Sequence, residues 1–357
     1  MSDELRVGII GAGGIAAKLH LPEMQTVPGM RVTLLAGRKE SRLKTLSERY
    51  GIPRWTHSYD EVIESDEIDA VIVAVPHPLH VTWGLKALNR GLHVFMQKPL
   101  STTLEEAEQF VQATEAGSAT VLALPYVSSP PVLAARQLVQ DGTLGTVSAA
   151  RARFSHGGPE VYYAGIQQIF GEQSADALWF FDASQADAGA LFDMGVYAIA
   201  RLVALVGSVS AVTARLTTVA KPTTLEDTAA VLLDFASGAL GVAETGWCDA
   251  ARSATFSVHG TAGRVMHDFR DPELRLLKPG SAVNEDAPLL EETVDLAAWP
   301  VQNAHQHWAD CIRQGTQPEL SSAAMARHIT EIMLAAQESS RTRRTVEVHS
   351  RCGCEPQ

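Results

Sequence analysis

The chain has 357 residues, of which 46% are hydrophobic and 20% are charged, and its formal net charge at pH 7 is -12. This composition is typical of a folded globular protein, and the length suits two domains of ordinary size. Because nucleic acids and anionic membrane surfaces attract clustered Lys and Arg, the negative charge argues against both as main partners and leaves small molecules.

Targeting signals are not apparent in the sequence. The N-terminal stretch MSDELRVGIIGAGG starts with acidic residues and has no separate apolar core followed by a cleavage site. No apolar stretch approaches the ~18 residues that span a bilayer, and four cysteines are too few and too scattered for a disulfide framework. We therefore expect a cytoplasmic protein without a membrane span. The terminal RCGCEPQ, with Cys352 and Cys354, is expected to be a solvated, disordered tail.

The first third of the chain alternates short β-rich runs with longer helical patterns. Residues 70–75 show no polar alternation, as expected for a strand of a parallel sheet that helices cover on both faces. This rhythm predicts an α/β fold, a doubly wound Rossmann domain over residues 1–125. The expected strands are 5–10, 31–37, 69–75, 93–97 and 120–126, and the expected helices are 16–27, 41–51, 79–91 and 104–117.

The pattern changes after about Tyr126, where longer alternating stretches are joined by turns such as ASG and GTAG. These features predict a C-terminal α+β domain over residues 126–357 with a large, mostly antiparallel sheet. Helices over 301–314 and 321–342 precede a last strand near Val346. We expect this domain to bind substrate and to form a homo-oligomer, a dimer or tetramer, because one face of such a sheet needs covering.

The glycine-rich stretch GIIGAGGIA places Gly11, Gly13 and Ala16 in the spacing G-x-G-x-x-A, directly after the first strand. Gly11 permits a tight turn, Gly13 lets the backbone approach a pyrophosphate, and Ala16 lets the following helix pack closely. We predict that this loop, including Gly14 and Ile15, binds a dinucleotide. The alternative is a turn that only joins strand to helix.

The end of the second strand bears on which dinucleotide binds. An NAD enzyme places Asp or Glu there to hold the ribose hydroxyls, whereas this chain has Gly37. Gly37 leaves room for a 2′-phosphate, and Arg38 and Lys39 supply cations to bind it. We expect NADP, with NAD as the less favoured cofactor. The alternative is a solvated Arg-Lys pair on a surface turn.

A lysine and a proline follow the strand expected fourth in the chain, in the stretch MQKPL. Lys98 stands at the carboxyl end of this strand, where open α/β sheets bind their ligands, and Pro99 fixes the chain direction after it. We predict that Lys98 faces the crevice that holds the nicotinamide. The alternative is a solvated lysine at a strand end.

With these motifs in order, the sequence resembles the glucose-fructose oxidoreductase, inositol dehydrogenase and MocA family of NAD(P)-dependent oxidoreductases over nearly its whole length. The shared features are the glycine loop, the strand end VIVAVPHPLH, a Glu-Lys-Pro triplet after GLHVF, and an Asp-x-Gly-x-His or Asp-x-Gly-x-Tyr segment, here DMGVY. The resemblance implies that Pro76, His80 and Gln97 lie at the cofactor. Gln97 replaces the glutamate of the triplet and lacks the charge that would favour a protonated Lys98.

The DMGVY segment lies in an apolar helical pattern that puts Asp193 and Tyr197 on one face. By resemblance to relatives such as dihydrodiol and xylose dehydrogenases, Tyr197 is the expected acid/base. Lys98 would lower its pKa from the usual ~10, and Asp193 would orient Lys98 or bind a substrate hydroxyl. The alternative is a buried tyrosine with a satisfied hydroxyl and an aspartate that pairs locally.

Tyr126, Trp179 and Phe180 are candidates for the wall of a substrate pocket, with His156 a weaker one, and ordinary packing is the alternative for all of them. His305 and His307 lie two apart on an expected helix and point in different directions, so we expect no metal.

The predicted function is an NADP-dependent oxidoreductase that moves hydride between nicotinamide and a carbonyl or secondary alcohol of a sugar, cyclitol or related polyol. Two alternatives remain: a catalytically silent sensor of NADP or sugar, and an NAD-dependent glycoside hydrolase.

Overall fold

The computed structural model describes residues 4–171, 179–186, 188–281, 284 and 286–356. The chain forms two compact units. Unit 1 contains Met1–Pro125, Pro159–Leu178 and Gln302–Arg327, and unit 2 contains Tyr126–Gly158, Trp179–Val301 and His328–Gln357. Two segments from beyond residue 125 therefore belong to the same unit as the N-terminal sheet. Hydrophobic periodicity in the sequence does not indicate which later segments pack with the N-terminal sheet.

Unit 1 is built on a six-stranded parallel sheet of order β3-β2-β1-β4-β5-β6, which confirms the predicted doubly wound fold. Its strands are β1 Leu5–Ile10, β2 Met30–Ala36, β3 Arg54–Thr56, β4 Ala70–Val73, β5 His93–Met96 and β6 Val121–Ala123. The sequence prediction missed β3, a short and partly exposed strand, so the strand before Lys98 is the fifth and not the fourth.

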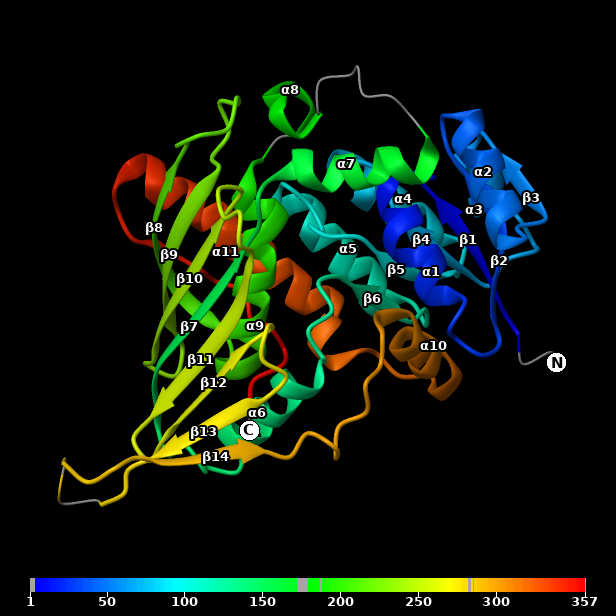
Figure 1. Cartoon of the computed structure of the whole chain (residues 1–357). Coiled ribbons are helices and arrows are strands. Elements are labelled where there is room, and N and C mark those ends of the chain that lie inside the picture. Colours follow the sequence, from blue (N-terminus) through cyan, green and yellow to red (C-terminus); the bar gives the residue numbers. More distant parts are fainter. Residues whose placement is uncertain (1–3, 172–178, 187, 282–283, 285, 357) are drawn as a thin grey trace. The chain divides into compact units, whose positions relative to one another are not determined.

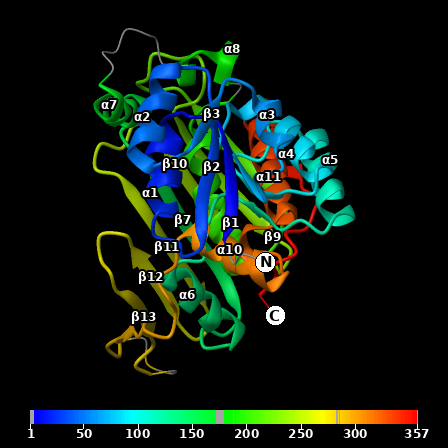
Figure 2. The ribbon, with the colours of Figure 1, turned by 90° about the vertical axis from the view of Figure 1, so that its right-hand side faces the viewer.

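Helices cover both faces of this sheet. Figure 2 shows α1 Leu21–Met24 and α2 Glu40–Tyr50 on one side, and α3 Tyr59–Ile63, α4 His80–Asn89 and α5 Leu104–Ala116 on the other. The single helix expected over 16–27 is instead the π-helical turn η1 Ala16–His20 followed by α1, with Pro22 in the first turn of α1. Unit 1 also contains η2 His77–Leu79, α7 Pro159–Phe170, α10 Ala304–Gln314 and η5 Glu319–Ser321.

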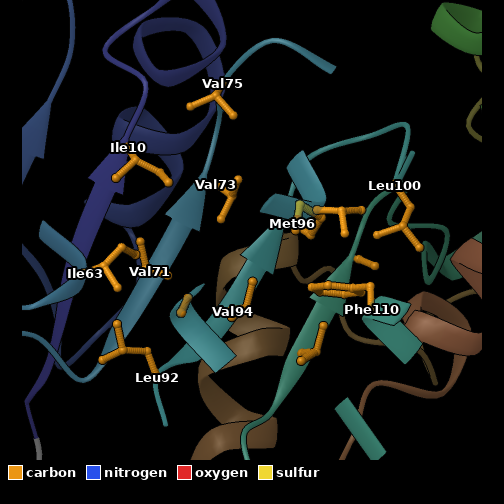
Figure 3. Packing of buried hydrophobic residues seen from close by; sticks show 14 of the residues in the cluster. Ile10, Ile63, Val71, Val73, Val75, Leu92, Val94, Met96, Leu100 and Phe110 are labelled. Atoms are coloured by element: carbon orange, nitrogen blue, oxygen red, sulfur yellow. The ribbon is translucent and has the colours of Figure 1, made fainter. Parts of the chain in front are cut away.

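One hydrophobic core cluster of unit 1 joins buried side chains of the sheet with side chains of the second group of helices (Figure 3). All four residues of β4 are fully buried, as the absence of polar alternation predicts. Val94 and Met96 of β5 pack in the same cluster as Phe110 of α5. This packing fixes the carboxyl ends of β4 and β5, after which the predicted site residues follow.

Unit 2 contains a nine-stranded sheet of order β14-β13-β12-β11-β7-β10-β9-β8-β15, and most of its strands are the green to yellow arrows of Figure 1. All neighbours are antiparallel except β7 and β10, which confirms the predicted, mostly antiparallel sheet. The strands are β7 Val147–Ser155, β8 Val209–Thr217, β9 Thr228–Phe235, β10 Leu240–Gly246, β11 Ser253–Gly260, β12 Arg264–Asp268, β13 Leu274–Lys278, β14 Leu290–Val294 and β15 Val346–Glu347.

One helix of unit 2, α9 Val196–Val206, is apolar on nearly all sides and packs on β7 and β10. It continues the π-helical turn η4 Leu191–Gly195. The other helices are α6 Pro130–Gln140, η3 Trp179–Phe181, α8 Ala183–Ala186 and α11 Ala323–Thr342, the last beginning in unit 1. Within the described ranges, no helix has both the length and the apolar character needed to cross a membrane.

The prediction of a solvated C-terminal tail is wrong. Cys352 and Cys354 are 0% and 2% exposed. The backbone N–H of Cys352 donates to Oγ of Ser208 at 2.9 Å, and Arg136 donates to the carbonyl oxygen of Glu355. Small thiol side chains bury readily once the neighbouring backbone groups find hydrogen-bond partners.

Candidate functional site

The glycine loop between β1 and η1 has the geometry that its motif predicts. Gly11 has a φ of 108° and donates its N–H to the carbonyl oxygen of Ala36 at 2.9 Å. A Cβ at Gly11 would lie 2.2 Å from the carbonyl oxygen of Ala74, so only glycine fits there. At Gly13 a Cβ would meet nothing within 4 Å. The loop therefore has open space at Gly13, where a pyrophosphate would approach its backbone.

The next three residues, Gly14 to Ala16, lie at the N-terminal end of the π-helical turn η1. Ile15 is the N-cap of η1 and makes no side-chain cap, so it leaves the first N–H groups to other acceptors. Ala16 is fully buried, as close packing of this helix requires. A Cβ at Gly14 would lie 2.0 Å from Cδ1 of Ile166 in α7. This contact could not be predicted from the sequence, because Ile166 in α7 lies about 150 positions after Gly14.

The turn after β2 has a role that sequence reasoning did not assign. Gly37 is buried, and a Cβ there would lie 2.7 Å from Cβ of Ala12 in the glycine loop. Packing against the loop therefore requires glycine at this position, whichever dinucleotide binds. Arg38 and Lys39 are exposed beside it. Burial raises the pKa of Tyr59 and the nearby charge of Arg38 opposes this shift, which places the Arg38 cation close to Tyr59.

His80 and Lys98 both lie near the carboxyl ends of β4 and β5. Nδ1 of His80 lies 2.7 Å from the carbonyl oxygen of Pro99, and its Nε2 lies 2.9 Å from that of Val75. The ring of His80 thus bridges the segment after β4 and the segment after β5. His80 is 1% exposed. Burial lowers the pKa of His80 and the two carbonyl contacts oppose this shift, while the charge of the half-buried Lys98 adds to the lowering. Pro76, also half-buried, precedes η2 between these elements.

Gln97 is 5% exposed, and its amide is engaged within unit 1. Its Oε1 accepts the backbone N–H of Lys98 at 3.2 Å, and its Nε2 lies 2.8 Å from Nε2 of His20. His20 was not among the predicted site residues. A histidine inside the helix that starts at the glycine loop was the available signal.

In unit 2, Asp193 lies in the π-helical turn η4 and is 9% exposed. Its Oδ2 accepts a 2.9 Å hydrogen bond from Nε1 of Trp247 and lies 3.9 Å from Nε2 of His156. Nδ1 of His156 accepts the N–H of Gly158, so the proton of the neutral ring is on Nε2, which faces Asp193. The structure thus brings the weaker candidate His156 to Asp193 and adds Trp247, which was not among the predicted site residues.

The start of η4 is held by Glu226. Its Oε1 accepts the N–H groups of Gly189 and Leu191, both at 3.1 Å. A Cβ at Gly189 would lie 2.2 Å from the carbonyl oxygen of Glu226. Burial raises the pKa of this carboxyl group. These contacts position the turn that carries Asp193.

Tyr197, in the first turn of α9, is half-buried and stacks on Phe154 of β7, with ring centroids 4.8 Å apart and an interplanar angle of 24°. The guanidinium carbon of Arg201 lies 4.8 Å from the centroid of the same Phe154 ring. Nη1 of Arg201 is buried and has no hydrogen-bond partner among the described residues. Burial lowers the pKa of Arg201 to about 10, while Tyr197 acts in the opposite direction. Sequence reasoning missed Arg201, although an arginine four residues after Tyr197 in an apolar helix was a visible signal.

Of the predicted pocket residues, Phe180 packs near Trp247, with ring centroids 6.4 Å apart. Tyr126 is half-buried at the start of unit 2. The side chain of Trp179 lies outside the described residues. Asp193, Tyr197, Phe180 and Trp247 therefore gather around one small cluster in unit 2.

His305 and His307 have different surroundings. His305 is fully buried, whereas Nε2 of His307 lies 3.7 Å from Sγ of Cys311. The described part of the chain contains no group of three or more His, Cys, Asp or Glu that could hold a metal ion.

Two models of one protein family match the chain. A model described as an oxidoreductase family with an NAD-binding Rossmann fold, GFO/IDH/MocA, matches residues 5–123. The model of the GFO/IDH/MocA C-terminal domain matches residues 132–266. Together the two matches cover more than half of the chain.

The names of several similar proteins refer to sugars or sugar derivatives as substrates. The dTDP-3,4-didehydro-2,6-dideoxy-alpha-D-glucose 3-reductase of Actinomadura kijaniata is 31% identical over 199 residues, 56% of this chain and 55% of the reductase. D-xylose 1-dehydrogenase (NADP(+)) 2 of Haloferax volcanii is 29% identical over 72% of this chain and 74% of that enzyme. The chain spans about half the length of several curated relatives that it matches. The solved structure of levoglucosan dehydrogenase in complex with NADH has a TM-score of 0.82 at 23% identity, covering 97% of this chain and 100% of that one, and so shares the fold.

Proposed function

The chain belongs to the GFO/IDH/MocA family of NAD(P)-binding oxidoreductases, and on that premise we propose that it transfers hydride between a nicotinamide cofactor and a sugar, cyclitol or related polyol. The reacting group is a carbonyl or a secondary alcohol. The observation that carries this proposal is the placement of Tyr197 on the Phe154 ring beside the half-buried cation of Arg201, because such a phenol is suited to exchange a proton with a substrate oxygen.

The cofactor in this proposal is NADP, with NAD less favoured. The open space at Gly13 fits a dinucleotide, because the backbone can approach the pyrophosphate there. Arg38 and Lys39 would hold a 2′-phosphate by charge. The reductase and the NADP-named xylose dehydrogenase support the sugar class, and the latter also supports NADP. Since packing against Ala12 already requires glycine at position 37, the preference rests on the two cations.

Bound nicotinamide supplies or accepts the hydride, and the protein handles the matching proton. Tyr197 donates its phenolic proton to the substrate oxygen during reduction and removes it during oxidation. The phenolate that forms is stabilised by cations, a role we assign to Arg201 and Lys98. Lys98 also polarises the carbonyl. Asp193, held by Trp247 and facing His156, binds a substrate hydroxyl or orients Lys98.

Phe180 and Tyr126 form apolar walls for the sugar ring in this proposal. Trp179 has the same proposed role. Aromatic faces suit the C–H surfaces of a sugar, while the polar cluster at Asp193 fixes its hydroxyl groups. His80 would act at the cofactor by holding the ends of β4 and β5 in place, because both of its ring nitrogens contact main-chain carbonyl oxygens.

The experiment that tests the proposal combines binding with turnover. NADPH and NADH are titrated by fluorescence, and the loaded enzyme is screened against aldoses, ketoses, cyclitol ketones and simple dicarbonyls. We expect NADPH to bind at least ~10-fold more tightly, a difference of about 1.4 kcal/mol, and this preference to fall in Arg38→Ala. Equal affinities would reject the NADP assignment. NADPH binding without turnover of any carbonyl substrate would favour a sensor, for which the replacement of glutamate by Gln97 is the supporting observation.

A further inference from the structure

Four side chains of unit 1 form one continuous hydrogen-bonded chain. Nε2 of Gln97 lies 2.8 Å from Nε2 of His20, and Nδ1 of His20 lies 2.8 Å from Nε2 of His305. Nδ1 of His305 lies 2.9 Å from Oε2 of Glu23. At the other end, Oε1 of Gln97 accepts the backbone N–H of Lys98. The chain therefore connects the main chain at Lys98 to a partly exposed carboxylate, whose side chain is 30% exposed.

The surroundings of this chain are apolar and aromatic. Phe95 of β5 stacks on His305, with ring centroids 4.6 Å apart and an interplanar angle of 11°, and contacts His20 edge-on at 5.3 Å. Trp308 packs edge-on against Phe95. Both histidine side chains are 0% exposed. Fixed ring orientation and exclusion of water make an unpaired donor or acceptor in this chain costly.

The direction of every hydrogen bond follows from the two ends. The Glu23 carboxylate only accepts, so His305 donates through Nδ1. If the ring is neutral, its Nε2 then accepts from Nδ1 of His20, and Nε2 of His20 accepts from Gln97. The N–H of Lys98 requires Oε1 of Gln97, which turns the amide nitrogen toward His20. Both ends thus demand the same orientation, and each link contains one proton.

We propose that Gln97, His20, His305 and Glu23 form a one-directional positioning chain for Lys98, in which both histidines are neutral with the proton on Nδ1. An amide at position 97 suits this hydrogen-bonded chain, because its nitrogen donates to His20 while its oxygen accepts from the backbone N–H of Lys98. Burial and the neighbouring His305 lower the pKa of His20 well below its usual range, in agreement with a neutral ring. What Lys98 does in catalysis rests on the proposed function, whereas the proton positions do not.

A carboxylate at position 97 would disturb this arrangement. The side chains at both ends of the chain would then only accept, and two neutral histidines supply only two protons for the three links. In Gln97→Glu the chain takes up one further proton, which makes a histidine cationic. The titratable groups that contact the chain from the described residues are Glu23 on α1, His20 on η1 and His305 on α10, with Lys98 attached through its N–H.

Moving the carboxylate from one end to the other should reverse the chain. In the double variant Gln97→Glu/Glu23→Gln, His20 donates through Nε2 to residue 97, and His305 donates through Nε2 to His20. The new amide at position 23 then donates to Nδ1 of His305. Each link again has one proton with both rings neutral, but both tautomers are inverted. Glu23→Gln alone keeps the original direction, because its amide oxygen still accepts.

The first test is nitrogen NMR of the full-length protein with ¹⁵N-labelled histidine. The signals of the two rings are assigned by their loss in His20→Asn and His305→Asn. At about pH 8 we expect both rings to be neutral with protonated Nδ1. An imidazolium, or a proton on Nε2 of either ring, overturns the proposal.

The second test measures unfolding free energy against pH for Gln97→Glu, with Gln97→Met as the matched control. In Gln97→Glu the added proton gives a histidine a folded pKa above its unfolded value of ~6.5. Its stabilising contribution is present below that value and is lost as pH rises through the folded pKa. We expect the free energy of unfolding of Gln97→Glu to fall, relative to wild type, as the pH is raised from about 6 to 9. For Gln97→Met we expect a difference from wild type that does not change with pH over this range. A flat difference for Gln97→Glu contradicts proton uptake.

The double variant provides the decisive comparison, and it remains informative if Gln97→Glu alone does not fold. We expect it to be more stable than Gln97→Glu, to lack that variant's additional pH dependence, and to show protonated Nε2 on both rings. Unchanged tautomers, or no rescue, overturn the proposal. None of these readouts needs cofactor or substrate, so failure of the proposed activity would be recognised separately.

Discussion

Arg201 and Tyr197, four residues apart along α9, contact the same aromatic ring, that of Phe154. Arg201 is half-buried, its Nη1 is buried, and among the described residues this nitrogen has no hydrogen-bond partner. A cation in such a position favours the anionic form of a neighbouring phenol. We therefore expect Arg201 to favour ionisation of Tyr197, in addition to the role proposed for Lys98.

Removal of this cation should change the pH dependence of turnover. We expect Arg201→Met to lower turnover near neutral pH by on the order of tenfold and to move the profile upward by about one pH unit, because phenolate becomes harder to form. Arg201→Lys keeps a charge and is the matched control. Steady-state rates from about pH 6 to 10 give the measurement. A uniform loss at every pH in Arg201→Met would indicate a packing role instead.

Lys98 and Tyr197 should behave as one catalytic unit. Lys98→Met and Tyr197→Phe are each expected to lower turnover by ~10²-fold or more, with NADPH affinity changed only a few-fold. The double variant should be much less than multiplicatively worse, because the lysine has little to tune once the phenolic proton is absent. Turnover rates of the four proteins, together with cofactor titrations, complete the cycle. Multiplicative losses would show that the two residues act independently.

Stability should fall in mildly acidic solution. Burial, together with the neighbouring His305, lowers the pKa of His20 well below its usual range. In the unfolded chain this ring gains a proton below pH ~6.5, whereas the folded ring stays neutral until lower pH. Stability is therefore unaffected by this group above ~6.5 and declines below it, by at most about 1.4 kcal/mol per pH unit.

Urea unfolding at several pH values measures this decline. His20→Gln, which has no titrating ring, should reduce the slope between about pH 5 and 6.5. An unchanged slope in that variant would contradict a neutral His20 in the folded protein.

The nine-stranded sheet presents a row of side chains that fits a subunit contact. Leu232, Val242, Arg151, Ser257 and Met266 lie in register across β9, β10, β7, β11 and β12. Leu232 and Met266 are 39% and 41% exposed, high values for large apolar side chains. We expect a homodimer or tetramer in sedimentation at micromolar concentration, and dissociation in Leu232→Glu. A monomeric wild-type protein would contradict this assembly.

Much of unit 1 follows from local sequence. The G-x-G spacing at Gly11 and Gly13 and the unbroken apolar run of β4 are patterns of neighbouring residues, so they predict the loop and the buried strand. The contact that requires glycine at position 11 comes from the distant Ala74 and is visible only in the structure. Strand β3 escaped prediction since its three residues are partly exposed and carry no alternation. Pro22 lies where one helix was expected and a π-helical turn followed by a short α-helix is found.

The missed site residues depend on contacts between distant segments. His20 and His305 are 285 positions apart, and periodicity gives no reason to bring them together. The same applies to Trp247 and Asp193, which are 54 positions apart. At Gln97 the sequence shows the loss of a carboxylate, but only the partners of its amide explain why an uncharged side chain fits.

Hydride transfer between the cofactor and a sugar or polyol can be followed with an isotope label on the cofactor. The enzyme is incubated with NADPH that carries deuterium at both C4 positions of the dihydronicotinamide ring and with the carbonyl substrates of the screen, and the products are analysed by mass spectrometry. We expect one deuterium on the carbinol carbon of a sugar or polyol product, and we expect Tyr197→Phe to slow its appearance by ~10²-fold or more. If wild-type protein binds the cofactor but no product gains carbon-bound deuterium, the assignment as a sugar oxidoreductase is contradicted.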